Sequence, residues 1–235
     1  MATPIVREVL QNSVGGGPVT VVTGVGTQVD DVLCTIHGCD YGTLAGMTTP
    51  TGTSGTWAED AFADLGVNTI HLKLWTRPVT VSGPQTVTVP DQGFGEENFQ
   101  FTYVVAGVAA VGGIDGAAGA TDGAGTSATA PSVPPTGTDD LLIAAWFSAN
   151  NVVNFSFPAG MTNGLEEETA GFVTLATARE VLTASGATGT RVATASVSCS
   201  GFTGVSIALK GAATAAGAGP PLSPYAGARR RLLVR

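Results

Sequence analysis

Two apolar stretches of this chain begin in the same way, with a pair of aspartates. The Asp-Asp pairs lie at positions 30–31 and 139–140, and almost all the residues that follow each pair are apolar. An Ala-Gly-Met-Thr sequence comes later in each case, at positions 45–48 and 159–162. The aspartate pairs are 109 positions apart and the Ala-Gly-Met-Thr sequences 114. Self-similarity at a nearly fixed distance indicates an internal repeat.

Short apolar runs between Gly, Pro and Asp turns predict strands throughout the chain. The clearest alternation is in 68–77, where Ile70, Leu72 and Leu74 share one face while His71, Lys73 and Trp75 share the other. This period of two is typical of a half-buried strand. The other predicted strands span 5–10, 18–23, 32–37, 85–89, 98–107, 126–130, 140–147, 152–157, 172–182, 189–199 and 202–210.

Two segments give no clear strand pattern. The pattern of residues 58–65 does not decide between a helical turn and a loop. Residues 108–125 are rich in Gly and Ala and are interpreted as a stretch that ends as a loop.

The repeat extends beyond the aspartate strands. Trp75-Thr76-Arg77 matches Thr177-Ala178-Arg179, and residues 103–107 match 207–211. We therefore predict two halves, about 19–107 and 126–211, of five or six strands each. Each half offers one apolar sheet face that it cannot bury alone, so the halves should face each other. The expected fold is an all-β, jelly-roll-like β-sandwich.

This interpretation divides the chain into three parts. Residues 1–17 form an N-terminal arm, 18–211 the β-sandwich, and 212–235 a linker with a basic C-terminal tip. The linker is assigned from its Ala, Gly and Pro content, which is typical of flexible segments.

Composition and charge support an all-β fold and limit the classes of binding partner. Only 12% of the 235 residues are charged, and Lys and Glu, which helical surfaces need, are scarce. A net charge of −8 disfavours nucleic acid as a partner. No apolar run approaches the roughly 20 residues that span a bilayer, and the N-terminus lacks the regions of a signal peptide. We expect a soluble protein made in the cytoplasm.

Five short sequences in the second half resemble a known family. In order they are Thr-Ala-Pro-Ser-Val (129–133), Thr-Asp-Asp-Leu-Leu (138–142), Pro-Ala-Gly-Met-Thr (158–162), Ser-Gly-Ala-Thr-Gly-Thr-Arg (185–191) and Val-Ser-Ile-Ala-Leu (205–209). This order resembles a β-sandwich domain of the minor tail proteins of tailed bacteriophages. The resemblance covers about residues 18–211 and is looser in the first half, where Leu44-Ala45-Gly46-Met47 replaces a Pro-Ala-Gly-Trp-like turn. It implies a virion structural or host-contact role and supplies no catalytic residues.

The candidate catalytic and metal-binding residues are few. His37 and His71 have no third ligand at a recognisable spacing. The acidic runs 96–97 and 166–168 can supply two carboxylates for glycoside hydrolysis, but acids at turns more often form a solvated edge. The aspartate pairs can be considered as calcium ligands, although a role in turns is favoured because the pairs recur at strand starts. We predict no enzyme, no catalytic or metal site and no cofactor.

The cysteine and aromatic residues give one further candidate. Cys34, Cys39 and Cys199 are too few for a disulfide framework; Cys34 is expected in the core, and a pairing of Cys39 stays open. Trp146 is expected in the core, whereas Trp75, on the polar face of its strand, is the best candidate for stacking on a sugar. The glycosylation sequon at Asn154 is interpreted as accidental.

The C-terminal tip combines Arg229-Arg230-Arg231 with Leu-Leu-Val on an acidic protein. It is either a docking peptide that orders on a partner or a solvated tail. The leading hypothesis is a non-enzymatic virion structural protein, a minor tail protein or a head fibre or decoration, anchored by its terminal segments. We expect tail or capsid proteins as partners, a homo-oligomer with a trimer as the first guess, and no nucleic acid or membrane.

Two other functions remain open at this point. The first is a carbohydrate-binding or adhesin module that contacts a glycan on the host surface, and the second is a polysaccharide hydrolase.

Overall fold

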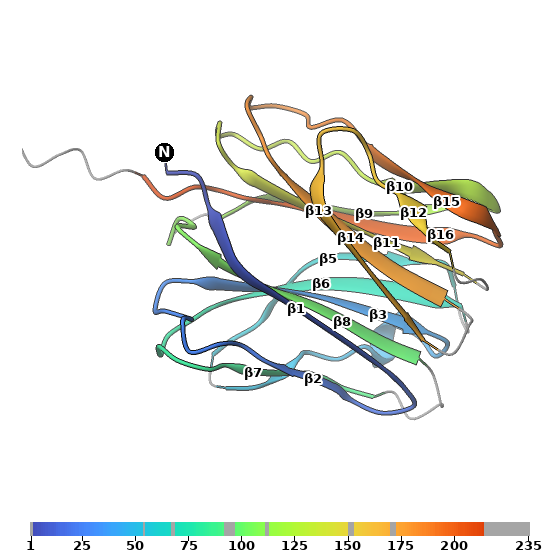
Figure 1. Ribbon diagram of the computed structural model, residues 1–235, viewed down its shortest axis with the longest axis horizontal. Coiled ribbons are helices and arrows are strands. Elements are labelled where there is room, and N and C mark those ends of the chain that lie inside the picture. The colour runs from blue at the N-terminus through green and yellow to red at the C-terminus, as the bar shows by residue number, and fades with distance from the viewer. Residues whose placement is uncertain are drawn as a thin grey trace, which may run out of the picture.

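The computed structural model describes residues 2–53, 55–66, 69–91, 97–110, 113–149, 153–169 and 173–213, which form antiparallel strands in four sheets (Figure 1). The strands of the first half are β1 (Ile5–Gly15), β2 (Val19–Val22), β3 (Val32–Asp40), β4 (Thr51–Gly52), β5 (Ala58–Asp64), β6 (Ile70–Pro78), β7 (Thr86–Val89) and β8 (Glu97–Ala106). Those of the second half are β9 (Ile114–Asp122), β10 (Gly125–Ala130), β11 (Leu141–Ser148), β12 (Phe155–Ser156), β13 (Thr162–Thr169), β14 (Val173–Val181), β15 (Arg191–Cys199) and β16 (Phe202–Leu209). A short 3-10 helix, η1, spans Leu44–Gly46.

The sheet orders show the internal repeat directly. The two large sheets have the orders β1-β8-β3-β6-β5 and β9-β16-β11-β14-β13, and the two small sheets β2-β7-β4 and β10-β15-β12. Each strand of the first half thus corresponds to the strand eight places later. The predicted all-β fold with two repeated halves is confirmed. Its jelly-roll detail stays a prediction.

The repeat unit is longer than predicted. The segment predicted as an N-terminal arm contains β1, which pairs with β8 along almost its whole length. The segment predicted to end as a loop contains β9, and residues 58–64 form β5. Each half therefore has eight strands in two sheets, where five or six strands and one apolar sheet face were expected.

The main core lies between the two large sheets, which form the middle layers in Figure 1. Aromatic rings of the two halves meet there, with the centroids of Phe99 and Phe147 5.2 Å apart. The Tyr103 hydroxyl lies 2.9 Å from the Thr177 hydroxyl. Two smaller cores lie between the large and the small sheet of each half. The large sheets are therefore covered on both faces, and β6 is buried on both instead of half-buried as predicted.

The aspartate pairs form equivalent turns in the two halves. Asp30 and Asp139 have φ angles of 72° and 67°, a left-handed conformation that Asp tolerates. The Asp30 N–H donates to the Val79 carbonyl (3.0 Å), and the Val79 N–H donates to the Asp31 carbonyl (2.7 Å). The second half repeats both bonds with Asp139, Asp140 and Leu182, at 2.9 and 2.8 Å. The predicted turn role is confirmed.

The two ends of the described chain meet at one end of the molecule (Figure 1). The Ala2 N–H donates to the Ala212 carbonyl (2.8 Å), and the Ala212 N–H donates to the Gly107 carbonyl (2.7 Å). Gly211 permits this close approach, since a Cβ there would lie 2.0 Å from the Ala2 carbonyl oxygen. Most of the predicted linker and the whole basic tip, residues 214–235, lie outside the described residues.

Candidate functional site

The two histidines lie on neighbouring strands, β3 and β6, but have separate partners. His37 is completely buried, and its Nε2 lies 3.1 Å from the Asn98 side-chain oxygen. Burial lowers the pKa of His37 to about 4, so the ring is neutral near pH 7. His71 Nδ1 instead lies 2.9 Å from an Asp64 carboxylate oxygen. Among the described residues, no three or more His, Cys, Asp or Glu side chains form a group that could hold a metal ion.

Trp75 is not on the surface, so the sequence-based prediction of an exposed sugar-stacking ring was wrong. Its side of β6 is covered, and the residue is only 5% exposed. The Lys73 ammonium lies 5.2 Å from the ring centroid, and Glu59 accepts a hydrogen bond from the same ammonium at 2.8 Å. Trp146 is buried as predicted, and its indole N–H donates to the Arg191 carbonyl (3.0 Å).

The acidic run 166–168 makes structural contacts. Glu166 accepts a hydrogen bond from the Phe155 N–H (2.5 Å). Glu167 accepts hydrogen bonds from the Gln11 amide (2.8 Å) and the Ser13 hydroxyl (2.7 Å), both on β1. Because β13 belongs to the second half, Glu167 links the edge strands of the two large sheets. The acidic run is therefore not only the solvated edge that the sequence predicts.

The remaining candidates are in ordinary structural positions. Glu97 is buried, and Glu96 lies outside the described residues. The three cysteines are buried and none of them forms a disulfide, and burial raises the pKa of Cys34 and Cys199. Asn154 is exposed next to the short strand β12.

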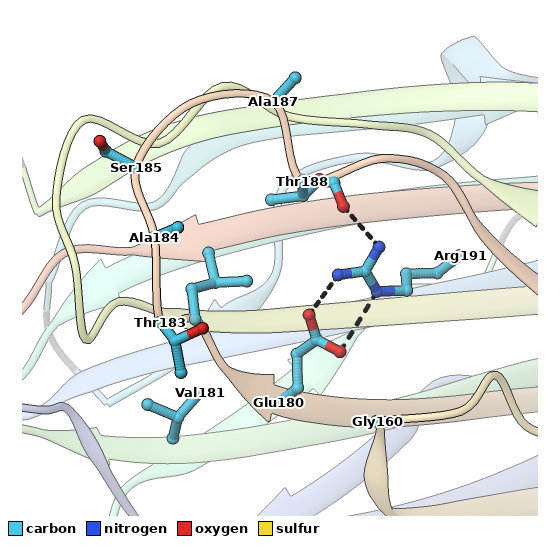
Figure 2. A pocket seen from close by; sticks show the side chains of 10 residues that line it. Gly160, Glu180, Val181, Thr183, Ala184, Ser185, Ala187, Thr188 and Arg191 are labelled. Atoms are coloured by element: carbon cyan, nitrogen blue, oxygen red, sulfur yellow. Dashed lines mark hydrogen bonds and ion pairs between the residues drawn. The ribbon is translucent and has the colours of Figure 1, made fainter.

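A pocket of about 330 Å³ lies beside the loop that joins β14 to β15 (Figure 2). The ion pair of Arg191 with Glu180 lines it; the two side chains are 17% and 12% exposed. Arg191 Nε donates to Glu180 Oε2 at 3.2 Å, and Nη2 donates to Oε1. Arg191 Nη1 donates to the Thr188 carbonyl at 2.6 Å and is also within reach of the carbonyls of the next two residues. Thr183 and Ser185, on the loop, also line the pocket (Figure 2).

The first half contains an equivalent of this arrangement with a different residue. Gln85 stands in the loop that joins β6 to β7, and its amide donates to the carbonyls of Val81 (2.9 Å) and Gly83 (3.0 Å). Its side-chain oxygen accepts a hydrogen bond from Arg77 (3.2 Å). In both halves one polar side chain therefore holds the carbonyl oxygens of the loop. The Arg191–Glu180 pair is thus explained by its structural role.

Sequence reasoning did not select this pocket. Arg191 appeared only as the last residue of a motif, and its partner Glu180 is eleven positions away on another strand. No signal in the sequence joins the two, because the approach of the start of β15 to the end of β14 is decided by tertiary structure.

No helix in the described part of the chain is long and apolar enough to cross a membrane. No protein-family model matches the sequence, and neither a curated protein nor a solved structure is significantly similar to it.

Proposed function

We propose that this chain is a non-enzymatic structural protein of a virion, displayed on the particle and anchored through its terminal segments. The order of short sequences in the second half, which resembles minor tail proteins of tailed bacteriophages, supports the virion assignment. A tail protein and a head fibre or decoration protein are both consistent with this resemblance. Partners would be other tail or capsid proteins.

The observation that carries the anchoring proposal is the position of the chain ends. Residues 2 and 212 are joined by a hydrogen bond of 2.8 Å, so the C-terminal segment leaves the fold beside the start of the chain, at one end of the molecule. A protein held from that end projects its opposite end away from the attachment point. The segment beyond residue 213 carries four of the ten Lys and Arg residues and no Asp or Glu, so the rest of the chain has an excess of twelve acids. A basic segment of this kind suits an acidic site on a neighbouring virion protein.

Truncation after Ala213 tests the anchoring role. We expect the truncated chain to keep its melting temperature and to be missing from purified particles. A matched control replaces residues 214–219 with Gly and Ser and keeps the basic tip, and this variant should incorporate normally. Equal incorporation of the truncated and full-length chains would overturn the proposal.

Attachment sites on particles are usually symmetric, so we also propose a homo-oligomer, with a trimer as the first expectation. Sedimentation equilibrium of the full-length chain should give about three times the 23.4 kDa of one copy. A monomer over the micromolar range would contradict this.

The alternative, a carbohydrate-binding or adhesin module, has lost its best candidate residue because Trp75 is buried. The hydrolase alternative is weakened as well, since Glu166 and Glu167 accept hydrogen bonds within the fold. We therefore do not propose either one.

A further inference from the structure

In each half the repeat places two charged side chains next to each other. The two charges are opposite in the first half and alike in the second. Val6 pairs with Val105, which pairs with Val32, and the next half repeats this row with Ile114, Leu209 and Leu141. Arg7 follows Val6 at a bulge, and Asp115 follows Ile114 at a bulge. Asp31 and Asp140 directly precede the third member of each row. Arg7 and Asp31 are therefore equivalent to Asp115 and Asp140.

In the first half the two side chains form an ion pair. Arg7 Nε lies 3.1 Å from Asp31 Oδ1, and the second oxygen of Asp31 accepts a hydrogen bond from the Gln28 N–H at 2.8 Å. In the second half the arginine is replaced by a carboxyl group, and the Asp115 and Asp140 side chains are neighbours.

The environments of the two carboxyl groups are unequal. Asp115 accepts hydrogen bonds from the Thr136 N–H (2.7 Å), the Thr136 hydroxyl and the Gly137 N–H (3.1 Å). Asp140 is fully buried; its Oδ1 accepts a hydrogen bond from the Gly211 N–H (3.3 Å), and its buried Oδ2 has no N–H or hydroxyl donor. Lys210, which follows β16, also lies near this pair, and its ammonium is 3.7 Å from Asp115.

We infer that Asp140 is a protonated carboxylic acid that donates its proton to a hydrogen bond with ionised Asp115, and that this pair is a pH-sensitive latch on the C-terminal end of the fold. Two ionised carboxylates in contact repel each other, whereas one shared proton converts the repulsion into a hydrogen bond. The proton sits on Asp140 because Asp115 already accepts hydrogen bonds that favour its ionised form.

The acidities of the two groups agree with this assignment. Burial, and then the neighbouring Asp115, raise the pKa of Asp140. For Asp115, burial alone would raise the pKa, but the hydrogen bonds from Thr136 outweigh it and the pKa is lowered. The folded chain therefore holds one proton between the lower and the upper pKa of the pair.

The sign of the pH dependence follows from linkage. A carboxyl group with a raised pKa in the folded chain stabilises the fold at low pH, and this contribution is lost as pH rises through the folded-state pKa. Deprotonation of Asp140 brings a second charge next to Asp115, so repulsion replaces the hydrogen bond between the two carboxyl groups. The bond from the Gly211 N–H favours the ionised form of Asp140, so the loss is in the contact with Asp115. Gly211 pairs with Val108 and precedes Ala212, so the latch holds the point where the C-terminal segment leaves the fold.

Asp140→Asn tests this inference because an amide supplies the same donor at every pH. We expect the melting temperature of the wild type to fall by about 3–5 °C relative to D140N between about pH 5 and about pH 9. Asp31→Asn is the matched control at the equivalent position of the first half. It should be less stable than the wild type at about pH 8, because it removes a charge from an ion pair.

Carbon-13 NMR of the side-chain carboxyl groups gives a second readout. The Asp140 carboxyl carbon should titrate at a higher pH than the Asp115 carboxyl carbon, as the directions of the two pKa shifts require. The inference is overturned if D140N loses stability at about pH 8 as D31N does, if it does not fold, or if Asp140 titrates at or below the pH at which Asp115 does. These measurements use the isolated chain, so they do not depend on the proposed virion role.

Discussion

At the scale of single residues, polar side chains in this protein serve the loops of the sandwich. Arg191 and Gln85 show this most clearly, since each donates to the carbonyl oxygens of the loop that precedes it. The two side chains differ in charge and size but make the same kind of hydrogen bond in equivalent loops. The repeat therefore conserves the hydrogen bonds of the loop and not the identity of the residue.

Arg191→Ala should lower the free energy of unfolding by about 2 kcal/mol, because it removes charged hydrogen bonds to Glu180 and to the loop carbonyls. Urea unfolding followed by tryptophan fluorescence measures the loss. Ser185→Ala, on the exposed rim of the same pocket, should change the free energy by less than about 0.5 kcal/mol. Equal effects of the two substitutions would contradict the loop-holding role.

His37 should make the fold sensitive to acid. Its pKa lies near 4 in the folded chain and near its ordinary value of 6.5 in the unfolded chain. The unfolded state binds more protons between these values, so stability falls by up to about 3 kcal/mol as pH drops from about 7 to about 4.

Histidine NMR titration should give the low pKa directly, and His37→Gln should reduce the loss of stability in acid. A titration of His37 near pH 6.5 would show that its burial is not maintained in solution.

At the scale of elements, the edge strands were the hardest to predict. β5, β9 and β13 all lie at edges of the large sheets, and none was predicted as a strand. β9 is rich in Gly and Ala and β13 carries three consecutive glutamates, so neither has the apolar alternation of a central strand. Contacts with the opposite half account for the residues that stand on these strands. Glu167 binds β1, and Gly119 lies against the backbone of β5.

Gly119→Ala should destabilise the contact between β9 and β5. A Cβ at this position would lie 1.7 Å from the Phe62 carbonyl oxygen, and only a shift of one strand can relieve the overlap. We expect a loss of about 2 kcal/mol or more, measured by thermal or urea unfolding. Gly123→Ala is the matched control, because a Cβ there meets no atom within 4 Å. If both variants are as stable as the wild type, the two edge strands are not in close contact.

At the scale of the whole molecule, the two halves share their largest core. Residues of both halves form the central hydrophobic cluster, and each half by itself would expose the inner face of its large sheet. An exposed apolar face of that size is unfavourable in water. We therefore expect the halves to unfold together.

Phe99→Ala tests this cooperativity. Phe99 belongs to the first half and contacts Phe147 of the second, and the substitution should cost about 3–5 kcal/mol. Hydrogen exchange of β14 and β16 in the second half should speed up as much as that of β3 and β8 in the first. Separate transitions for the two halves in calorimetry, or an effect confined to the first half, would show that they fold independently.

The sequence by itself determined the strand class and the repeat. Turn residues and apolar runs act locally, so they predicted the central strands, the aspartate turns and the burial of Trp146. Local patterns also showed that the chain consists of two similar halves.

Only the tertiary structure decided which faces are buried and which residues meet. Alternation in β6 placed Trp75 on a polar face, but a face of a sheet is exposed only if no other layer covers it. The large sheets are covered twice, which no local pattern reports. In the same way, Asp115 and Asp140 are 25 positions apart and meet only because β9 and β11 flank β16. The pairing of the two aspartates therefore depends on the fold and cannot be predicted from the sequence.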